Sequence, residues 1–181
     1  QGTRVINLSL GTASDFSVVR DAVSYAASRG VILVAAAGNE NGSPVLYPAA
    51  YSQVVAVGSV GSSDGVSSFS NAGAELDLVA PGENILSTAL AGGSHVAYEA
   101  ASGTSFAAPY VAGIASLVAS RFPSLLPSQI QDLLEDQADK LPGMGGQTFH
   151  PSYGSGRVSG ARAVAIHASW ESQSSHPRLI A

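Results

Sequence analysis

The chain has 181 residues, 45% of them hydrophobic and 12% charged, with a formal net charge of -5 and no cysteine. This size and apolar content predict one domain around one core, while the acidic balance excludes a nucleic-acid partner and the lack of cysteine excludes disulfides, thiolate nucleophiles and Cys-based zinc sites. No apolar run reaches the roughly 18 to 20 residues that span a bilayer, so we expect no membrane partner.

Three apolar runs in the first third of the chain predict buried strands: Arg4–Leu8, Gly30–Asn39 and Val54–Val60. The second run has no polar alternation, as is typical of strands that are covered on both faces. Between the first two runs, apolar residues recur at helical spacing from Phe16 to Ala26, with Ser14 or Asp15 as the expected N-cap and Gly30 as the stop. A strand, a helix and a strand with short links predict a right-handed parallel crossover.

The rest of the chain predicts mainly helices. The weaker strand candidates Leu76–Ala80 and Ile85–Ser87 are separated by a Pro-Gly turn. We then expect helices at Ser105 to about Ser120, at Pro127 to about Ala138, and from Ser159 or Gly160 through Trp170, with a loop at Gly143–Gly146 and a frayed tail at 171–181. The predicted class is α/β, with three layers: a mostly parallel sheet flanked by helices.

Ligands in open parallel sheets bind beyond the carboxyl ends of the strands, so the segments that follow strands matter most. Those segments here are Ser9-Leu10-Gly11, Ala37-Gly38-Asn39 and, before the first long helix, Gly103-Thr104-Ser105. A serine at a helix start lies among unpaired backbone N–H groups, where negative charge is stabilised.

Two interpretations of Ser105 follow from the local pattern. In the first, Ser105 is an N-cap that satisfies a backbone donor. In the second it is a nucleophile: Gly103 allows close approach, Ala107 and Ala108 leave room for a substrate, and Pro109 falls where the helix has no donor to lose.

The segment GTSFAAPYVAG, Gly103 to Gly113, resembles the nucleophile motif of the subtilisin-like serine proteases, the subtilases. RVINLSLG resembles the family's substrate-backbone strand, GVILVAAAGNE its oxyanion-hole segment, YPAAYSQVVAVGSV and SSFSNAGAELDLVAPGENILST the region before the nucleophile, and YGSGRVSGARAV the closing helix. The resemblance implies that residues 1–170 are the C-terminal portion of a subtilase catalytic domain, with a sheet that is incomplete on its N-terminal side.

The resemblance implies residue roles. Ser105 would be the nucleophile and its own N–H one oxyanion donor, while the Asn39 amide would be the second donor; the alternative for Asn39 is a turn residue after Gly38. An extended polypeptide substrate would pair with Ser9, Leu10 and Gly11.

The primary specificity pocket would be lined by Ala36, Ala37 and Gly38, with Leu46 near its base and Gly103 and Thr104 beside the nucleophile. Such a lining favours apolar or aromatic side chains. Strand-end packing is the alternative role for the two alanines.

Glu75 and Asp77, on one face of an extended segment, match a family position for a weak cation site shared with carbonyl groups of the YPAAY region. Oxygen ligands suit a structural calcium or sodium ion. A solvated strand face is the alternative, and the chemistry itself requires no cofactor.

A subtilase also needs a histidine base and an aspartate, and both precede the matching segment in the family. His95, His150, His167 and His176 have the sequence context of surface or loop residues, and Tyr110 stands where the family often has histidine and is expected to affect packing. We therefore expect the aspartate and histidine in an upstream segment or a partner chain. The alternative is a catalytically inactive remnant that binds peptides or another protein; a nucleophile elbow is excluded because no G-x-S-x-G surrounds Ser105. The resemblance also implies an extracellular protein.

Overall fold

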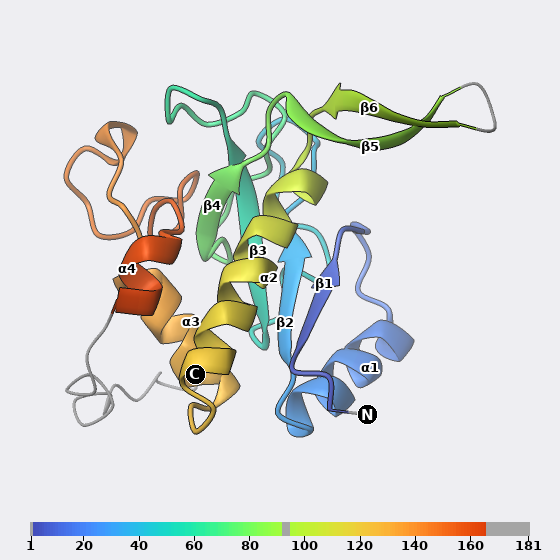
Figure 1. The fold of residues 1–181 in the computed structure, drawn as a ribbon, viewed down its shortest axis with the longest axis vertical. Coiled ribbons are helices and arrows are strands. Elements are labelled where there is room, and N and C mark those ends of the chain that lie inside the picture. Colours follow the sequence, from blue (N-terminus) through green and yellow to red (C-terminus); the bar gives the residue numbers. More distant parts are fainter. Residues whose placement is uncertain (1, 92–94, 166–181) are drawn as a thin grey trace.

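The computed structural model describes residues 2–91 and 95–165. Its main sheet has the order β1-β2-β3-β4, with all neighbours parallel (Figure 1). The strands are β1 (Val5–Leu8), β2 (Ile32–Ala36), β3 (Val54–Val60) and β4 (Leu78–Pro81). The predicted α/β class with a parallel sheet is confirmed, and the fourth strand begins at Leu78 rather than at Leu76.

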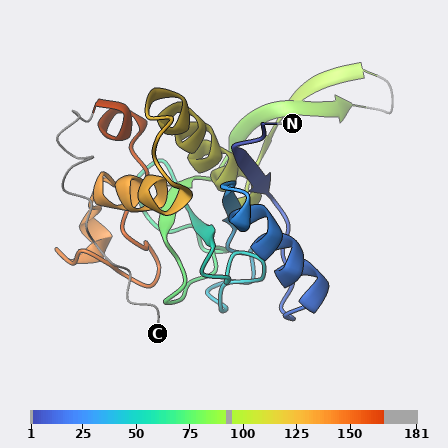
Figure 2. The ribbon, with the colours of Figure 1, turned by 90° about the horizontal axis from the view of Figure 1, so that it is seen from below.

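Helices cover both faces of this sheet. The helix α1 (Ser17–Ser28) lies on one face, and α2 (Thr104–Arg121), α3 (Pro127–Asp136) and α4 (Gly160–Ala165) lie on the other (Figure 2). Successive residues of β2 alternate between two cores: Val34 packs with α2 and α3, and Leu33 packs with Val23 of α1. Burial on both faces explains why β2 shows no polar alternation in the sequence.

A hairpin extends from the body of the molecule above the start of α2 (Figure 1). It consists of β5 (Ile85–Ala91) and β6 (His95–Ala101), paired antiparallel and separate from the main sheet. The sequence predicted only Ile85–Ser87 of this hairpin and missed β6. Leu86 and Tyr98 are 69% and 70% exposed, so the hairpin lacks the one-sided burial that produces a readable strand pattern.

The start of α1 differs from the prediction. Its N-cap is Phe16, which makes no side-chain cap hydrogen bond, so the expected capping by Ser14 or Asp15 is wrong. The Asp15 carboxylate instead accepts a hydrogen bond from the Tyr51 hydroxyl at 2.6 Å and pairs with Arg20. A contact to a residue 36 positions away therefore replaced the local cap.

We expect Asp15→Asn to lower the free energy of unfolding at neutral pH and to lose that effect in acid. The Tyr51 hydroxyl bond, and after it the Arg20 guanidinium, hold the pKa of Asp15 below its ordinary value of 3.8. A carboxyl group with a lowered folded-state pKa stabilises the fold above its unfolded-state pKa, and the contribution disappears as the pH falls through the folded-state pKa. Chemical denaturation at neutral pH and well below 3.8 measures this. Tyr51→Phe should weaken the pH dependence, and equal destabilisation by Asp15→Asn at both pH values would contradict the assignment.

The C-terminal part follows the prediction in outline. Helix α3 starts at Pro127 as expected but ends at Asp136, and a short 3-10 turn, Pro142–Met144, lies at the expected loop. The start of α4 at Gly160 also agrees, while its predicted continuation to Trp170 and the tail 171–181 lie outside the described residues. None of the helices in the described ranges has both the length and the apolar character to cross a membrane.

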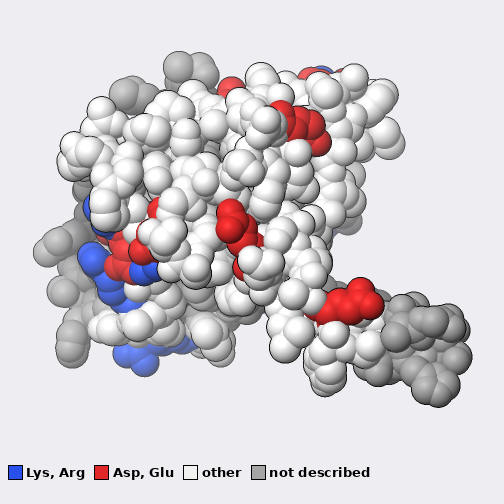
Figure 3. Space-filling view, turned by 90° about the horizontal axis from the view of Figure 1, so that it is seen from above, with Lys and Arg blue, Asp and Glu red and all other residues white. Residues whose placement is uncertain are grey.

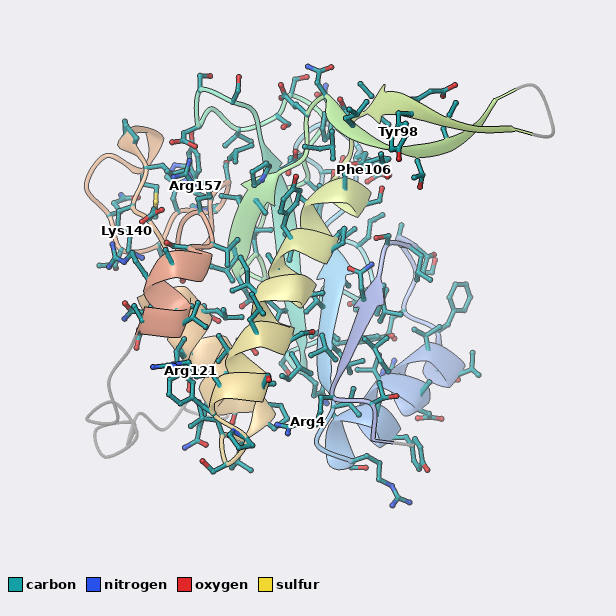
Figure 4. All side chains as sticks on the ribbon, viewed as in Figure 1. Arg4, Tyr98, Phe106, Arg121, Lys140 and Arg157 are labelled. Carbon is teal, nitrogen blue, oxygen red and sulfur yellow. The ribbon has the colours of Figure 1, made fainter. Side chains whose placement is uncertain are left out.

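An ion-pair cluster holds this part of the chain to the rest. Arg157 pairs with Asp64 and, at 3.2 Å, with Asp139, which also contacts Arg162 at 3.5 Å. Figure 4 shows Arg157 at the side of the molecule away from β1. The cluster therefore links the segment before α4 to the loop after β3.

Candidate active site

Three segments far apart in the sequence meet at the carboxyl ends of β1 and β2 and at the start of α2 (Figure 1). They border a cleft of about 150 Å³. Its lining residues are Ser9, Leu10, Gly11, Ala36, Gly38, Asn39, Glu40, Leu46, Thr104 and Ser105. Figure 3, which views this end of the molecule, shows separate acidic patches on a mostly uncharged surface, with most of the visible Lys and Arg at one edge. The structure thus brings together most of the residues that the sequence singled out.

Ser105 lies in the first turn of α2 and is half-buried. The N-cap of this helix is Gly103, with no side-chain cap hydrogen bond, so the interpretation of Ser105 as an N-cap is wrong. Its hydroxyl is therefore not occupied in closing the helix. The N–H groups at a helix start have no intrahelical acceptor, so the Ser105 N–H is available to a bound oxyanion.

The Asn39 side chain is fixed by Thr104. Asn39 Oδ1 accepts hydrogen bonds from the Thr104 N–H and from Thr104 Oγ1, both at 2.9 Å. Thr104 Oγ1 in turn accepts the Gly38 N–H at 3.2 Å, and the Thr104 side chain is fully buried. Because both hydrogen bonds from Thr104 hold the carbonyl oxygen, the Asn39 amide directs its Nδ2 donor away from Thr104. This tertiary role replaces the alternative of a simple turn residue.

Gly103 shows that the Ser105 hydroxyl and the Asn39 amide border the same space. A Cβ atom added at Gly103 would lie 3.2 Å from Ser105 Oγ and 3.4 Å from Asn39 Nδ2. Both polar atoms therefore approach one small volume beside Gly103. A carbonyl group placed in this volume could present its carbon to the hydroxyl and its oxygen to the amide donor, as acyl-transfer chemistry requires.

Gly38 is required for conformation and for space. Its φ of +114° is a value that residues with a side chain rarely adopt. A Cβ atom there would lie 2.3 Å from Asn71 Nδ2 and 2.8 Å from Leu46 Cγ. The chain can therefore turn from β2 into the Asn39 segment only with glycine at this position.

The remaining predicted substrate residues divide between the cleft and the core. Leu46 packs against Gly11, where an added Cβ would meet its side chain at 2.9 Å, and Leu10 is 58% exposed. Ala36 lines the cleft, but the Ala37 side chain is fully buried in the core on the α1 side. Ala36 is also only 5% exposed and belongs to the core on the α2 side, so both alanines have the packing position that the sequence left open as an alternative.

Glu40 and Asn71 belong to this site and were missed from the sequence. Glu40 lines the cleft, and Asn71 is 1% exposed behind it. Asn71 Nδ2 donates to Glu40 Oε2 at 2.7 Å and to the Pro44 carbonyl at 3.0 Å, while Asn71 Oδ1 accepts the Glu40 N–H at 2.7 Å. No local signal could reveal this, because Glu40 and Asn71 are 31 residues apart and meet only in the fold.

We expect Asn71→Ala to lower the free energy of unfolding of the complete protein by about 2 to 4 kcal/mol. The change leaves the Glu40 N–H and the Pro44 carbonyl without their buried partner, and unmade buried hydrogen bonds are costly. Urea denaturation provides the measurement. Ser28→Ala is the matched control, because the Ser28 hydroxyl donates to the Tyr25 carbonyl at 2.7 Å on the exposed face of α1. If both variants lost the same small amount, Asn71 would not be the anchor of this segment.

Pro109 does not have the position that the sequence predicted. It lies inside α2, where a helical N–H at residue 109 would donate to the carbonyl of Ser105, so a donor is in fact lost. The Ser105 carbonyl accepts the Ser9 hydroxyl instead, at 2.8 Å.

None of the described residues that line the cleft is a histidine. His150 lies in the loop before α4, accepting the Ser152 N–H at 3.1 Å and contacting the Tyr153 ring, and His95 begins β6. His167 and His176 lie outside the described residues. Tyr110 is 45% exposed on α2, so its expected effect on packing is limited.

Glu75 and Asp77 do not share one extended face as predicted. Glu75 lies in a turn, with its carboxylate over Gly73, whereas Asp77 accepts the Ala56 N–H at 2.8 Å. Among the described residues no group of three or more His, Cys, Asp or Glu side chains could hold a metal. The two carboxylates thus face different neighbours.

The helix-flanked parallel sheet, with a serine in the first turn of a helix and an amide beside it, defines a protein of the α/β class. The chain belongs to the subtilase family, whose model matches residues 1–156. Subtilisin E of Bacillus subtilis is 44% identical over 159 residues, which cover 86% of this chain and 39% of that protein. Subtilisin BL of Lederbergia lenta is 44% identical over 163 residues, covering 90% of this chain and 57% of that protein.

Solved structures agree with this assignment. A protease of Pseudoalteromonas arctica superposes with a TM-score of 0.81 at 36% identity, covering 89% of this chain and 50% of that one. The prenylagaramide maturation protease PagA superposes with a TM-score of 0.77 at 26% identity, covering 91% of this chain and 61% of that one. The chain thus spans between about two fifths and three fifths of these relatives.

Proposed function

We propose that this chain is the nucleophile-bearing C-terminal portion of a serine endopeptidase of the subtilisin type. The observation that supports this most directly is the Asn39 amide, which Thr104 fixes beside Ser105 with its donor end toward the space at Gly103. The hydroxyl and the amide donor thus border one space, where a substrate carbonyl group could lie.

In the proposed reaction, Ser105 Oγ attacks the carbonyl carbon of a peptide bond. A histidine supplied from outside this sequence takes the hydroxyl proton, and an aspartate orients that histidine. The resulting oxyanion is bound by the Ser105 N–H and by Asn39 Nδ2. The histidine then passes the proton to the leaving amine, which leaves an acyl-enzyme on Ser105. Water hydrolyses that ester by the reverse sequence of proton transfers and restores the serine.

The walls of the cleft suggest how a substrate is held. An extended polypeptide would pair with the main chain of Ser9 to Gly11. Such main-chain pairing depends on the conformation of the substrate more than on its sequence. Beside this segment, Ala36 and Leu46 offer an apolar wall, so we propose a preference for apolar or aromatic side chains. Glu40 is the charged residue of the lining, and Asn71 holds its carboxylate.

An upstream segment, or a partner chain, would complete this protein. Within the described residues β1 pairs on one side only, with β2, so its other edge can accept a further strand. The segment that carries the aspartate and the histidine would add strands there, next to Ser9. By the same family relationship we propose an extracellular location.

A serine-directed probe tests the proposal. The intact mass of the naturally produced protein is first measured under denaturing conditions. The protein is then treated with a fluorophosphonate and digested, and the labelled residue is located by mass spectrometry. A mass above 18.2 kDa, or a co-purifying chain with the aspartate and histidine, together with an adduct on Ser105, would support the protease. A single species of 18.2 kDa without an adduct would contradict it.

A second function is a catalytically inactive remnant that binds peptides or another chain. The observation in its favour is that no histidine lies among the described residues of the cleft. Retained binding of an extended peptide without cleavage or probe labelling would support this alternative. A structural calcium or sodium ion near Glu75 and Asp77 stays a separate proposal, tested by unfolding with and without a chelator, and no catalytic step depends on it.

A further inference from the structure

The Ser9 hydroxyl joins the end of β1 to the nucleophile residue. Ser9 Oγ donates to the Ser105 carbonyl at 2.8 Å, and Asn7 Nδ2 donates to Ser9 Oγ at 2.9 Å. We propose that the Ser9 side chain is a positioning residue for Ser105, because it supplies the hydrogen bond that Pro109 removes from the helix. This role is separate from any main-chain contact of Ser9 with substrate, and it rests on the proposed function of Ser105 as a nucleophile.

The need for this bond arises from Pro109. In an α-helix the N–H of each residue donates to the carbonyl four residues earlier, so an N–H at residue 109 would donate to the Ser105 carbonyl. Proline has no N–H, and its ring crowds that same carbonyl. The first turn of α2 therefore loses the bond that would hold the Ser105 peptide group in place, at the residue where position matters most.

Ser9 is well placed to supply the missing donor. It follows β1 directly, and the Asn7 amide, two residues earlier, donates to its oxygen. That leaves the single hydroxyl hydrogen of Ser9 to donate to Ser105. The bond spans 96 residues of sequence, so it fixes the start of α2 against the sheet and not merely against its own helix.

The backbone of Ser105 is thereby held on both sides. Before it, the N–H and hydroxyl of Thr104 are bound to Asn39 Oδ1, and after it the carbonyl is bound to Ser9. These two anchors restrict rotation of the residue between them. We infer that they keep the Ser105 hydroxyl and N–H directed toward the space at Gly103, where the substrate carbonyl would lie.

The experiment compares Ser9→Ala, Ser9→Thr, Pro109→Ala and the double variant Ser9→Ala with Pro109→Ala in the complete protein. The readout is the second-order rate of Ser105 labelling by a small fluorophosphonate, because this probe does not need the peptide-binding main chain of Ser9. Ser116→Ala is the matched control, since the Ser116 hydroxyl donates to the Ala112 carbonyl of the same helix at 2.8 Å, away from the cleft.

We expect Ser9→Ala to slow labelling by roughly three- to tenfold, the scale of one hydrogen bond, and Ser9→Thr to restore most of the rate. In the Pro109→Ala background the new N–H donates to the Ser105 carbonyl, so Ser9→Ala should then slow labelling by less than about twofold. The control should label at the wild-type rate.

Two failures are distinguishable. If the wild-type protein does not label at all, the proposed function fails, and the positioning role fails with it. If the wild type labels and Ser9→Ala labels equally fast, or slows equally in both Pro109 backgrounds, only the positioning role is overturned. Should Pro109→Ala fail to fold, the contrast between Ser9→Ala and Ser9→Thr still tests the positioning role. Threonine keeps the hydroxyl but changes the size of the side chain, so a role that depends on shape would not be restored by it.

Discussion

Replacing Ser105 by alanine in the complete protein is expected to lower kcat for peptide hydrolysis by roughly a millionfold, the scale on which a subtilisin responds to loss of its nucleophile. Without the hydroxyl no acyl-enzyme forms, and only the oxyanion donors and substrate binding remain to accelerate attack by water. Steady-state hydrolysis of a chromogenic peptide measures the change.

Ser116→Ala serves as the control for that experiment, because it removes a hydroxyl from the same helix at a position outside the cleft lining. Its kcat should equal that of the wild type. Binding of a peptide inhibitor to the Ser105→Ala protein should persist, since the segment Ser9 to Gly11 and the pocket are unchanged. Wild-type turnover in Ser105→Ala would mean that another group is the nucleophile.

The second large effect is expected at Asn39. Asn39→Leu should lower kcat by about a hundred- to a thousandfold while KM changes little, because the amide would bind the oxyanion of the transition state more strongly than the ground-state carbonyl. That magnitude is the one known for the corresponding donor of subtilisin. Hydrolysis rates over a range of substrate concentrations separate the two parameters.

A second substitution distinguishes the donor from the anchor at this residue. Asn39→Asp keeps an oxygen that can accept both hydrogen bonds from Thr104 but removes the Nδ2 donor. If the donor matters, Asn39→Asp should lose at least as much kcat as Asn39→Leu. If Asn39→Asp kept the wild-type kcat and only Asn39→Leu lost activity, Asn39 would act by holding Thr104 and not by binding an oxyanion.

The sequence by itself predicted the class of fold and the segments of the site. Uninterrupted apolar runs such as Ile32–Ala36 indicate strands buried on both faces, and short links between strand and helix restrict the sheet to a parallel arrangement. The carboxyl ends of parallel strands share one edge, so Ser9 and Asn39 could be expected near each other before any coordinates. These inferences depend on local periodicity and chain connectivity, which a sequence displays directly.

The tertiary structure alone decided the contacts that fix the site. Asn71 behind Glu40, Thr104 on Asn39, and Ser9 on the carbonyl that Pro109 leaves without a donor all join residues tens of positions apart. Local reasoning likewise assigned Asp15 to a helix cap, whereas the fold placed it on Tyr51. A buried polar group forms hydrogen bonds with the partners that lie close to it in the folded protein. Those partners depend on how the sheet and the helices pack, and a local sequence pattern contains no information on that packing.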